Sequence, residues 1–191
     1  MPWSLKRFHE SGQTHFVTFS CYRRCPLLIE PTAKQAFESA LERVRRCYEV
    51  RIYAYVIMPE HVHLLLSEPE RETLAVAIKS LKQGVSRRLI GEAGHFWHKR
   101  YYDFNIRDHK QFVEKLRYIH RNPVTRGLCD CPEDWEWSSF RHYATGCEGS
   151  VKIESEWAAR KRQRAAGQLA SGRRTTPLKQ MKLEWGTLAR K

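Results

Sequence analysis

The chain has 191 residues, of which 41% are apolar or aromatic, and it carries a formal net charge of +13. This length supports one compact domain with an extension and is too short for two full domains. No apolar run approaches the roughly 18 residues that span a bilayer, and the first residues, MPWSLKR, lack the apolar core of a signal peptide. We therefore expect a cytoplasmic protein that does not act at a membrane.

Four segments have the composition of β-strands, because they are rich in β-branched and aromatic side chains. They are residues 15–24, 50–58 and 61–67, with a fourth strand inside 96–107.

Three segments show apolar side chains at helical spacing. They are a stretch opened by Pro31 and two stretches over residues 72–90 and 109–121. The last helix is expected to end before Pro123, since a residue that precedes proline disfavours helical geometry.

The order strand, helix, strand, strand, helix, strand predicts an α+β fold. We expect a ferredoxin-like antiparallel sheet with helices on one face and an extra helix at the C-terminal side. Residues 1–150 would form this domain.

Residues 151–191 are expected to form a basic tail that is flexible or contacts DNA. From Ala158 to Lys191 there are ten Lys or Arg residues and one acid. Such an arm commonly binds polyanions. A solvated tail whose charge only aids solubility is the alternative.

The segment HVHLLLS places His61 and His63 on one face of its strand, because strand side chains alternate between faces. Val62, Leu64 and Leu66 would face the core. The two imidazoles then lie side by side on the other face, where a cation could bridge them. Two ordinary polar residues on an exposed sheet face are the alternative.

Tyr118 and Asn122 lie one helical turn apart on the third helix. At about 100° per residue, both fall off the buried stripe formed by Phe112, Leu116 and Ile119. Tyr118 is thus expected to present its hydroxyl outward with the Asn122 amide nearby. A tyrosine at the edge of the core and an asparagine that ends a helix are the alternatives.

Three sequence blocks, taken together, resemble the REP-associated tyrosine transposases, which are bacterial single-tyrosine enzymes of the HUH endonuclease superfamily. The blocks are MPEHVH, FW followed by YYD and IR, and YIHRNPV followed by RGL. They lie within residues 1–145, in order. The resemblance implies that His61 and His63 bind a metal, that Tyr118 is the catalytic tyrosine, and that Asn122 completes the metal site, with His120 as an alternative ligand.

This resemblance implies an enzyme that nicks and rejoins single-stranded DNA at REP-like hairpins through a 5′-phosphotyrosine. Ligand chemistry favours Mg²⁺ or Mn²⁺, although these ligand types also allow zinc. The enzyme could act as a monomer or a homodimer. The alternative is a non-catalytic protein of the same fold that binds single-stranded nucleic acid.

DNA binding requires cations and rings that neutralise phosphates and stack on bases. The segment WHKRYY and the second helix combine these residue types. The expected DNA-binding residues are Arg23, Arg24, Lys79, Lys82, Arg87, Arg88, Trp97, Lys99, Arg100 and Tyr102.

Overall fold

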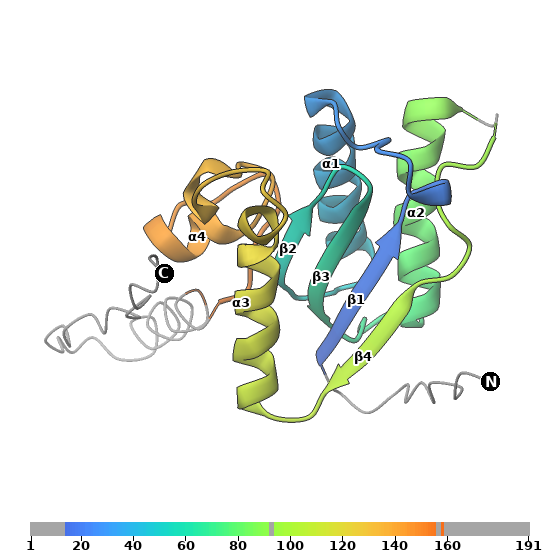
Figure 1. Ribbon diagram of the computed structural model, residues 1–191. Coiled ribbons are helices and arrows are strands. Elements are labelled where there is room, and N and C mark those ends of the chain that lie inside the picture. The colour runs from blue at the N-terminus through green and yellow to red at the C-terminus, as the bar shows by residue number, and fades with distance from the viewer. Residues whose placement is uncertain (1–13, 92–93, 156–157, 159–191) are drawn as a thin grey trace, which may run out of the picture.

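The computed structural model describes residues 14–91, 94–155 and 158. Within them the chain forms a four-stranded antiparallel sheet in the order β2-β3-β1-β4 (Figure 1). The elements, in chain order, are β1 (Thr14–Ser20), η1 (Tyr22–Arg24), α1 (Pro31–Cys47), β2 (Ile52–Ile57), β3 (His61–Ser67), α2 (Leu74–Ile90), β4 (Tyr102–Ile106), α3 (His109–Thr125), η2 (Pro132–Asp134) and α4 (Phe140–Thr145).

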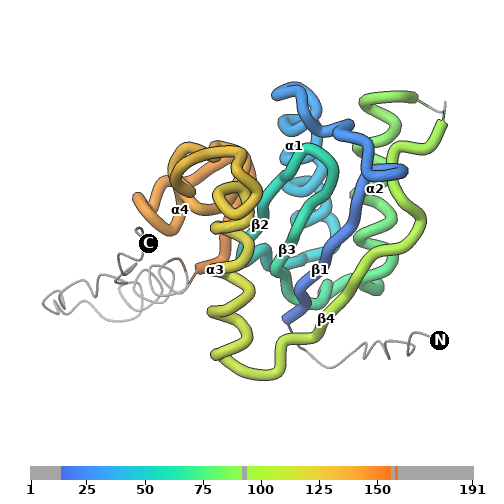
Figure 2. Tube along the Cα trace, viewed as in Figure 1, coloured from blue at the N-terminus to red at the C-terminus, as the bar shows by residue number. Residues whose placement is uncertain are grey.

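The two faces of the sheet carry different helices. Helices α1 and α2 lie side by side on one face, and α3 lies on the other, against β2 and β3 (Figures 1 and 2). The predicted α+β fold, with a ferredoxin-like strand order, is confirmed. The third helix turns the opposite sheet face into a second packed layer, which is where the candidate site forms.

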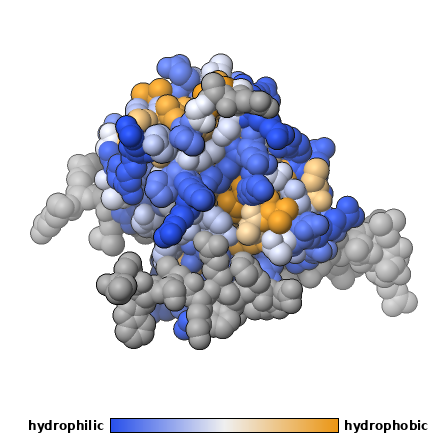
Figure 3. Space-filling view, turned by 90° about the vertical axis from the view of Figure 1, so that its right-hand side faces the viewer, coloured by the Kyte–Doolittle hydropathy of each residue, from blue (hydrophilic) through white to orange (hydrophobic). Residues whose placement is uncertain are grey.

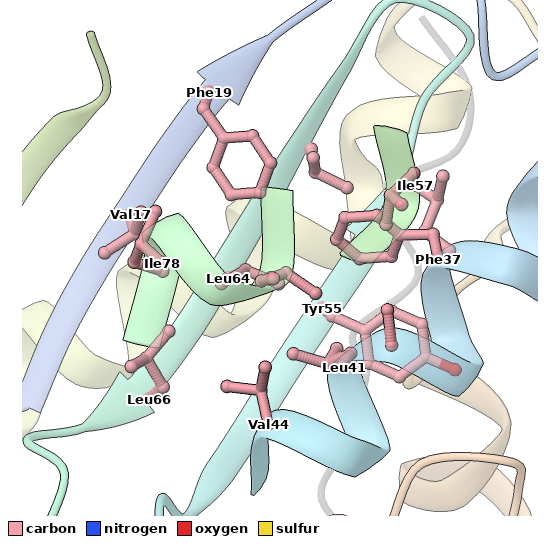
Figure 4. Packing of buried hydrophobic residues seen from close by; sticks show 14 of the residues in the cluster. Val17, Phe19, Phe37, Leu41, Val44, Tyr55, Ile57, Leu64, Leu66 and Ile78 are labelled. Atoms are coloured by element: carbon pink, nitrogen blue, oxygen red, sulfur yellow. The ribbon is translucent and has the colours of Figure 1, made fainter. Parts of the chain in front are cut away.

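Strand alternation divides the side chains of β3 between these two layers. Val62, Leu64 and Leu66 pack in the cluster beneath α1 and α2, whereas Leu65 packs in the cluster beneath α3. The first cluster joins residues from five elements whose side chains point toward one another (Figure 4). Each fully buried aliphatic or aromatic side chain contributes about 1.5–3 kcal/mol, so this layer fixes the sheet that carries the histidines.

Helix α3 is longer than predicted. It runs to Thr125 with Pro123 inside it, so the expected end before Pro123 is wrong. The proline removes one backbone donor in the last turn, but Arg126 N–H still donates to the Asn122 carbonyl at 3.0 Å. Burial of Pro123 against the rest of the fold outweighs the local preference, and Asn122 keeps helical geometry.

Packing continues past residue 150. Val151 and Ile153 are buried in the cluster beneath α1, and Ile153 forms a parallel bridge with Ile52 on β2. The predicted boundary between a domain of residues 1–150 and a tail of 151–191 stays a prediction, because most of the tail lies outside the described residues. Within the described part of the chain, every helix is too short or too polar to cross a membrane.

Candidate active site

Two histidines at the start of β3 bring their imidazole nitrogens together. His61 and His63 are both buried, and their rings meet edge to face with centroids 4.7 Å apart. Their Nε2 atoms are 3.0 Å apart. Two nitrogen ligands at about 2.1 Å from one cation, at angles of about 90–110°, lie roughly 3.0–3.4 Å apart. The observed separation therefore fits two ligands of the same ion.

The outer nitrogen of each ring is held by a neighbouring side chain. His61 Nδ1 donates to Glu60 Oε1 at 3.0 Å, and His63 Nδ1 lies 2.7 Å from the Thr18 hydroxyl. Thr18 stands directly opposite His63 in the β1–β3 register. Because a carboxylate on Nδ1 fixes the tautomer, His61 turns the lone pair of its Nε2 toward His63. At most one proton then occupies the space between the two Nε2 atoms, and a cation can replace it.

Burial keeps both imidazoles neutral at pH 7. It lowers the pKa of His61 more than the neighbouring Glu60 carboxylate raises it. For His63, burial and the charges of His61 and Lys115 lower the pKa to about 3. Neutral imidazole is the form that binds a cation, so the pair is ready for one without an energetic cost of deprotonation.

The Asn122 amide lies against the same two rings. Its Nδ2 is 3.3 Å from His63 Nε2, and its Oδ1 is buried without a hydrogen-bond partner among the described residues. A half-turn of the amide exchanges the two atoms and directs the oxygen toward the histidines. An orphaned buried acceptor costs about 1–3 kcal/mol, and a cation would satisfy it. The residues present thus fit a divalent cation held by two imidazoles and one amide oxygen.

No group of three or more His, Cys, Asp or Glu side chains in the described ranges could hold a metal ion, so the fit depends on this amide. His120, the alternative third ligand, lies elsewhere. Its Nε2 is 2.8 Å from Ser139 Oγ and its ring packs on Phe140 and Tyr143. The geometry favours Asn122 over His120.

Tyr118 stands next to the histidine pair on α3. Its side chain is 49% exposed, and its ring meets His63 edge to face at 5.2 Å between centroids. A second edge-to-face contact, at 5.8 Å, joins it to Phe16. Because α3 continues through Asn122, Tyr118 and Asn122 keep their spacing of one helical turn over β3. The outward phenol and the candidate metal ligands therefore share one surface.

Tyr101 and Tyr102, the rival tyrosines, occupy other positions. Tyr102 begins β4 and is 44% exposed, with its ring 6.5 Å from that of Phe16. Tyr101 precedes the strand and packs against the opposite cluster. Of the three, Tyr118 is the one whose ring contacts His63.

Comparison with known proteins gives the family. The protein family described as "Transposase IS200 like" matches residues 9–122, which is more than half of the chain. The chain belongs to the IS200-like transposase family. It is 28% identical over 137 residues to the REP-associated tyrosine transposase of Escherichia coli K12, covering 71% of this chain and 81% of that protein. It is 33% identical over 117 residues to a Haemophilus influenzae protein also described as a REP-associated tyrosine transposase, covering 54% of this chain and 66% of that one.

A solved structure is similar as well. The structure of a REP-associated tyrosine transposase bound to a REP hairpin superimposes with a TM-score of 0.66 at 26% identity. The match covers 80% of this chain and 92% of that one. This transposase thus shares its α+β architecture with a hairpin-bound relative.

The basic residues expected to bind DNA fall into three groups in the transposase. Arg23 and Arg24 are exposed on η1, and the charge of Arg24 reaches His61. Lys79 and Arg87 on α2 line a cavity of about 580 Å³ together with Lys99. Two further exposed arginines are Arg88 on α2 and Arg100 before β4. This side of the molecule, which carries α2 and β4, is mostly hydrophilic (Figure 3).

Two of the expected DNA-binding residues, Trp97 and Lys82, take part in the packing of the fold and also line this cavity. Trp97 is 8% exposed, packs on Phe19 and Phe37, and donates its indole N–H to the Lys82 carbonyl. The Lys82 ammonium donates to the carbonyls of His98 and Lys99, at 2.7 and 3.3 Å. Alternating cations and rings in the sequence could not reveal that this tryptophan points inward.

Sequence reasoning missed four polar side chains around the site. They are Thr18, Glu60, Lys115 and Arg126. Arg126 donates to the same Glu60 oxygen that accepts from His61, at 2.9 Å. Lys115 could have been found from its place one turn before Tyr118. Glu60 could have been found from its place directly before His61. Thr18 and Arg126 come from strand pairing and from the end of α3, which the sequence does not display.

Proposed function

We propose that this transposase cuts and rejoins single-stranded DNA through a covalent bond to Tyr118, with a divalent cation bound by His61, His63 and Asn122. The observation that carries the proposal is the ring contact between the exposed Tyr118 and His63, whose Nε2 lies 3.0 Å from that of His61. A binding protein would need neither the paired Nε2 atoms nor an exposed phenol beside them.

IS200-like transposases generally depend on a metal. When bound here, Mg²⁺ or Mn²⁺ would polarise the scissile phosphate and stabilise the charge on its oxygens. Glu60 and Thr18 would keep both histidines oriented, and the Asn122 amide oxygen would face the same point.

The reaction exchanges one phosphoester for another. The Tyr118 oxygen attacks phosphorus and loses its proton to solvent, while the bond to the 3′ oxygen breaks and that oxygen takes up a proton. The products are a 5′-phosphotyrosine and a free 3′-hydroxyl. Because the covalent intermediate retains a phosphodiester bond, a second 3′-hydroxyl can reverse the reaction without ATP.

The proposed substrate is DNA with a REP-like hairpin beside a single-stranded cleavage site. A relative of similar fold is bound to a REP hairpin, which supports the same class of DNA here. The exposed cations of η1 and α2 would neutralise backbone phosphates, and Tyr102 would stack on an unpaired base. The enzyme would act as a monomer or a homodimer.

The test is covalent capture. The full-length protein is incubated with 5′- or 3′-labelled hairpin DNA and Mn²⁺, then separated on a denaturing gel. We expect a protein adduct that carries the strand 3′ of the cut and is lost in Tyr118→Phe. Binding without adduct in the unmodified protein would support a non-catalytic nucleic-acid-binding protein, and an adduct in Tyr118→Phe would remove Tyr118 from its role.

A further inference from the structure

A lysine lies over the rings that surround the candidate nucleophile. Lys115 Nζ is 4.9 Å from the centroid of the Phe16 ring, 5.1 Å from that of Phe104 and 5.9 Å from that of Tyr118. It comes from α3, one turn before Tyr118, so the helix itself brings the ammonium to the phenol. Its charge also reaches His63, whose pKa it helps to lower.

The ammonium is held by ring faces instead of by an acid. No carboxylate forms an ion pair with Lys115 in the part of the chain that the structure describes. Attraction to a ring is weak and leaves the three N–H groups available to a stronger acceptor. Lys115 is half-buried and has no acidic partner among the described residues. A phosphate would supply both the opposite charge and acceptors for its N–H groups, so the ammonium favours binding of such an anion.

Two other cations of the fold, Lys82 and Arg126, are already paired with protein groups. The Lys82 ammonium donates to two backbone carbonyls on the opposite layer. Arg126 is paired with Glu60 at 2.9 Å. Lys115 differs from both because it lies beside the phenol and keeps its donors for a substrate.

We propose that Lys115 is a further catalytic residue, which contacts the non-bridging oxygens of the phosphate attacked by Tyr118. This inference rests on the proposed function and adds a residue to it. Negative charge increases on those oxygens as the Tyr118 oxygen bonds to phosphorus, and an ammonium fixed beside them stabilises that charge. Lys115 exchanges no proton in this role. It neutralises charge on the same phosphate that the cation site would bind from the side of His63.

The experiment compares Lys115→Gln with Arg117→Gln, which removes a positive charge from an exposed position of the same helix. Adduct formation is measured in single turnovers at saturating hairpin DNA, and DNA affinity is measured separately. We expect Lys115→Gln to slow adduct formation about tenfold or more with affinity changed less than about threefold. Arg117→Gln should keep the rate, and Lys115→Arg should recover most of it.

A neutral substrate separates charge stabilisation from a structural role. A methylphosphonate at the cleavage position removes the phosphate charge that Lys115 would contact. The rate ratio between the unmodified protein and Lys115→Gln should then shrink toward one. An unchanged ratio, or a Lys115→Gln rate within about twofold of the unmodified protein on normal DNA, would overturn the inference.

These outcomes are distinct from failure of the proposed function. If the unmodified protein forms no adduct, or Tyr118→Phe still forms one, the proposed nucleophile is wrong. If Tyr118→Phe alone abolishes the adduct and Lys115→Gln leaves it intact, only the role of Lys115 is wrong. Thermal unfolding of each variant excludes loss of fold as the cause.

Discussion

Thr18→Val replaces the hydroxyl that holds His63 with a methyl group of nearly the same size. The hydroxyl lies 2.7 Å from His63 Nδ1, on a neighbouring strand in direct register. The substitution leaves the shape of β1 intact and removes the side-chain hydrogen bond at Nδ1 of this imidazole, while the contacts at its Nε2 remain. It therefore tests whether His63 acts as an oriented ligand.

The expected magnitude follows from burial and hydrogen bonding. His63 is 4% exposed, so its Nδ1 would lose a partner that water cannot readily replace. An orphaned buried group costs about 1–3 kcal/mol of stability. Loss of a partner behind a metal-binding histidine lowers metal affinity or activity about 10–100-fold.

The assay is a Mn²⁺ titration of adduct formation with labelled hairpin DNA. We expect the half-maximal Mn²⁺ concentration to rise about 10–100-fold in Thr18→Val, with activity recovered at high Mn²⁺. Thr14→Val, on the same strand and face but four residues away, is the matched control and should titrate like the unmodified protein. A Thr18→Val midpoint within about threefold of the unmodified protein would refute the orienting role.

Three further predictions concern the packing that supports the site. Ile119 is fully buried beneath α3, so Ile119→Ala should lower the free energy of unfolding by about 2–5 kcal/mol and Ile119→Val by about 0.5–1.5 kcal/mol in urea titrations; equal losses would contradict this packing. Trp97→Ala should lower the free energy of unfolding by about 3–5 kcal/mol, while a folded sample keeps its DNA affinity within about twofold. Weaker DNA binding by a folded Trp97→Ala sample would show that the indole contacts DNA. Burial lowers the pKa of His15, but the hydrogen bonds and charges of Asp103 and Glu68 raise it by more, so its pKa is raised overall. This stabilisation is complete below about pH 6.5 and is lost as pH rises through the folded pKa. Asp103→Asn should flatten the decline of the unfolding temperature between pH 6 and pH 9, and an equally steep decline would show that the pair does not cause it.

Much of the candidate site was predictable because the pattern that encodes it is local. The strand over His61–Ser67 has the predicted bounds, and its alternation puts both histidines on the face away from α1 and α2. The angular position of Tyr118 on its helix likewise predicts an exposed phenol, and the structure gives 49% exposure. These conclusions need only the periods of a strand and a helix.

The predicted end of the helix before Pro123 was wrong because tertiary packing outweighs the local conformational preference there. A residue before proline avoids helical geometry in isolation, but burial of Pro123 and Asn122 holds α3 together for another turn. The packing of Trp97 was likewise beyond a local pattern, since its ring is in contact with Phe19 and Phe37 from two other elements.

The sequence by itself determined which side chains of β3 face which layer of the sheet, and its family resemblance implies a candidate nucleophile and two candidate metal-binding imidazoles. Only the tertiary structure decided which residues lie around them. Thr18 and His63 are 45 positions apart, and Phe16, Phe104 and Lys115 come from three elements. Strand register and helix docking set such contacts through the packing of the whole core, and no local period of the chain contains that information.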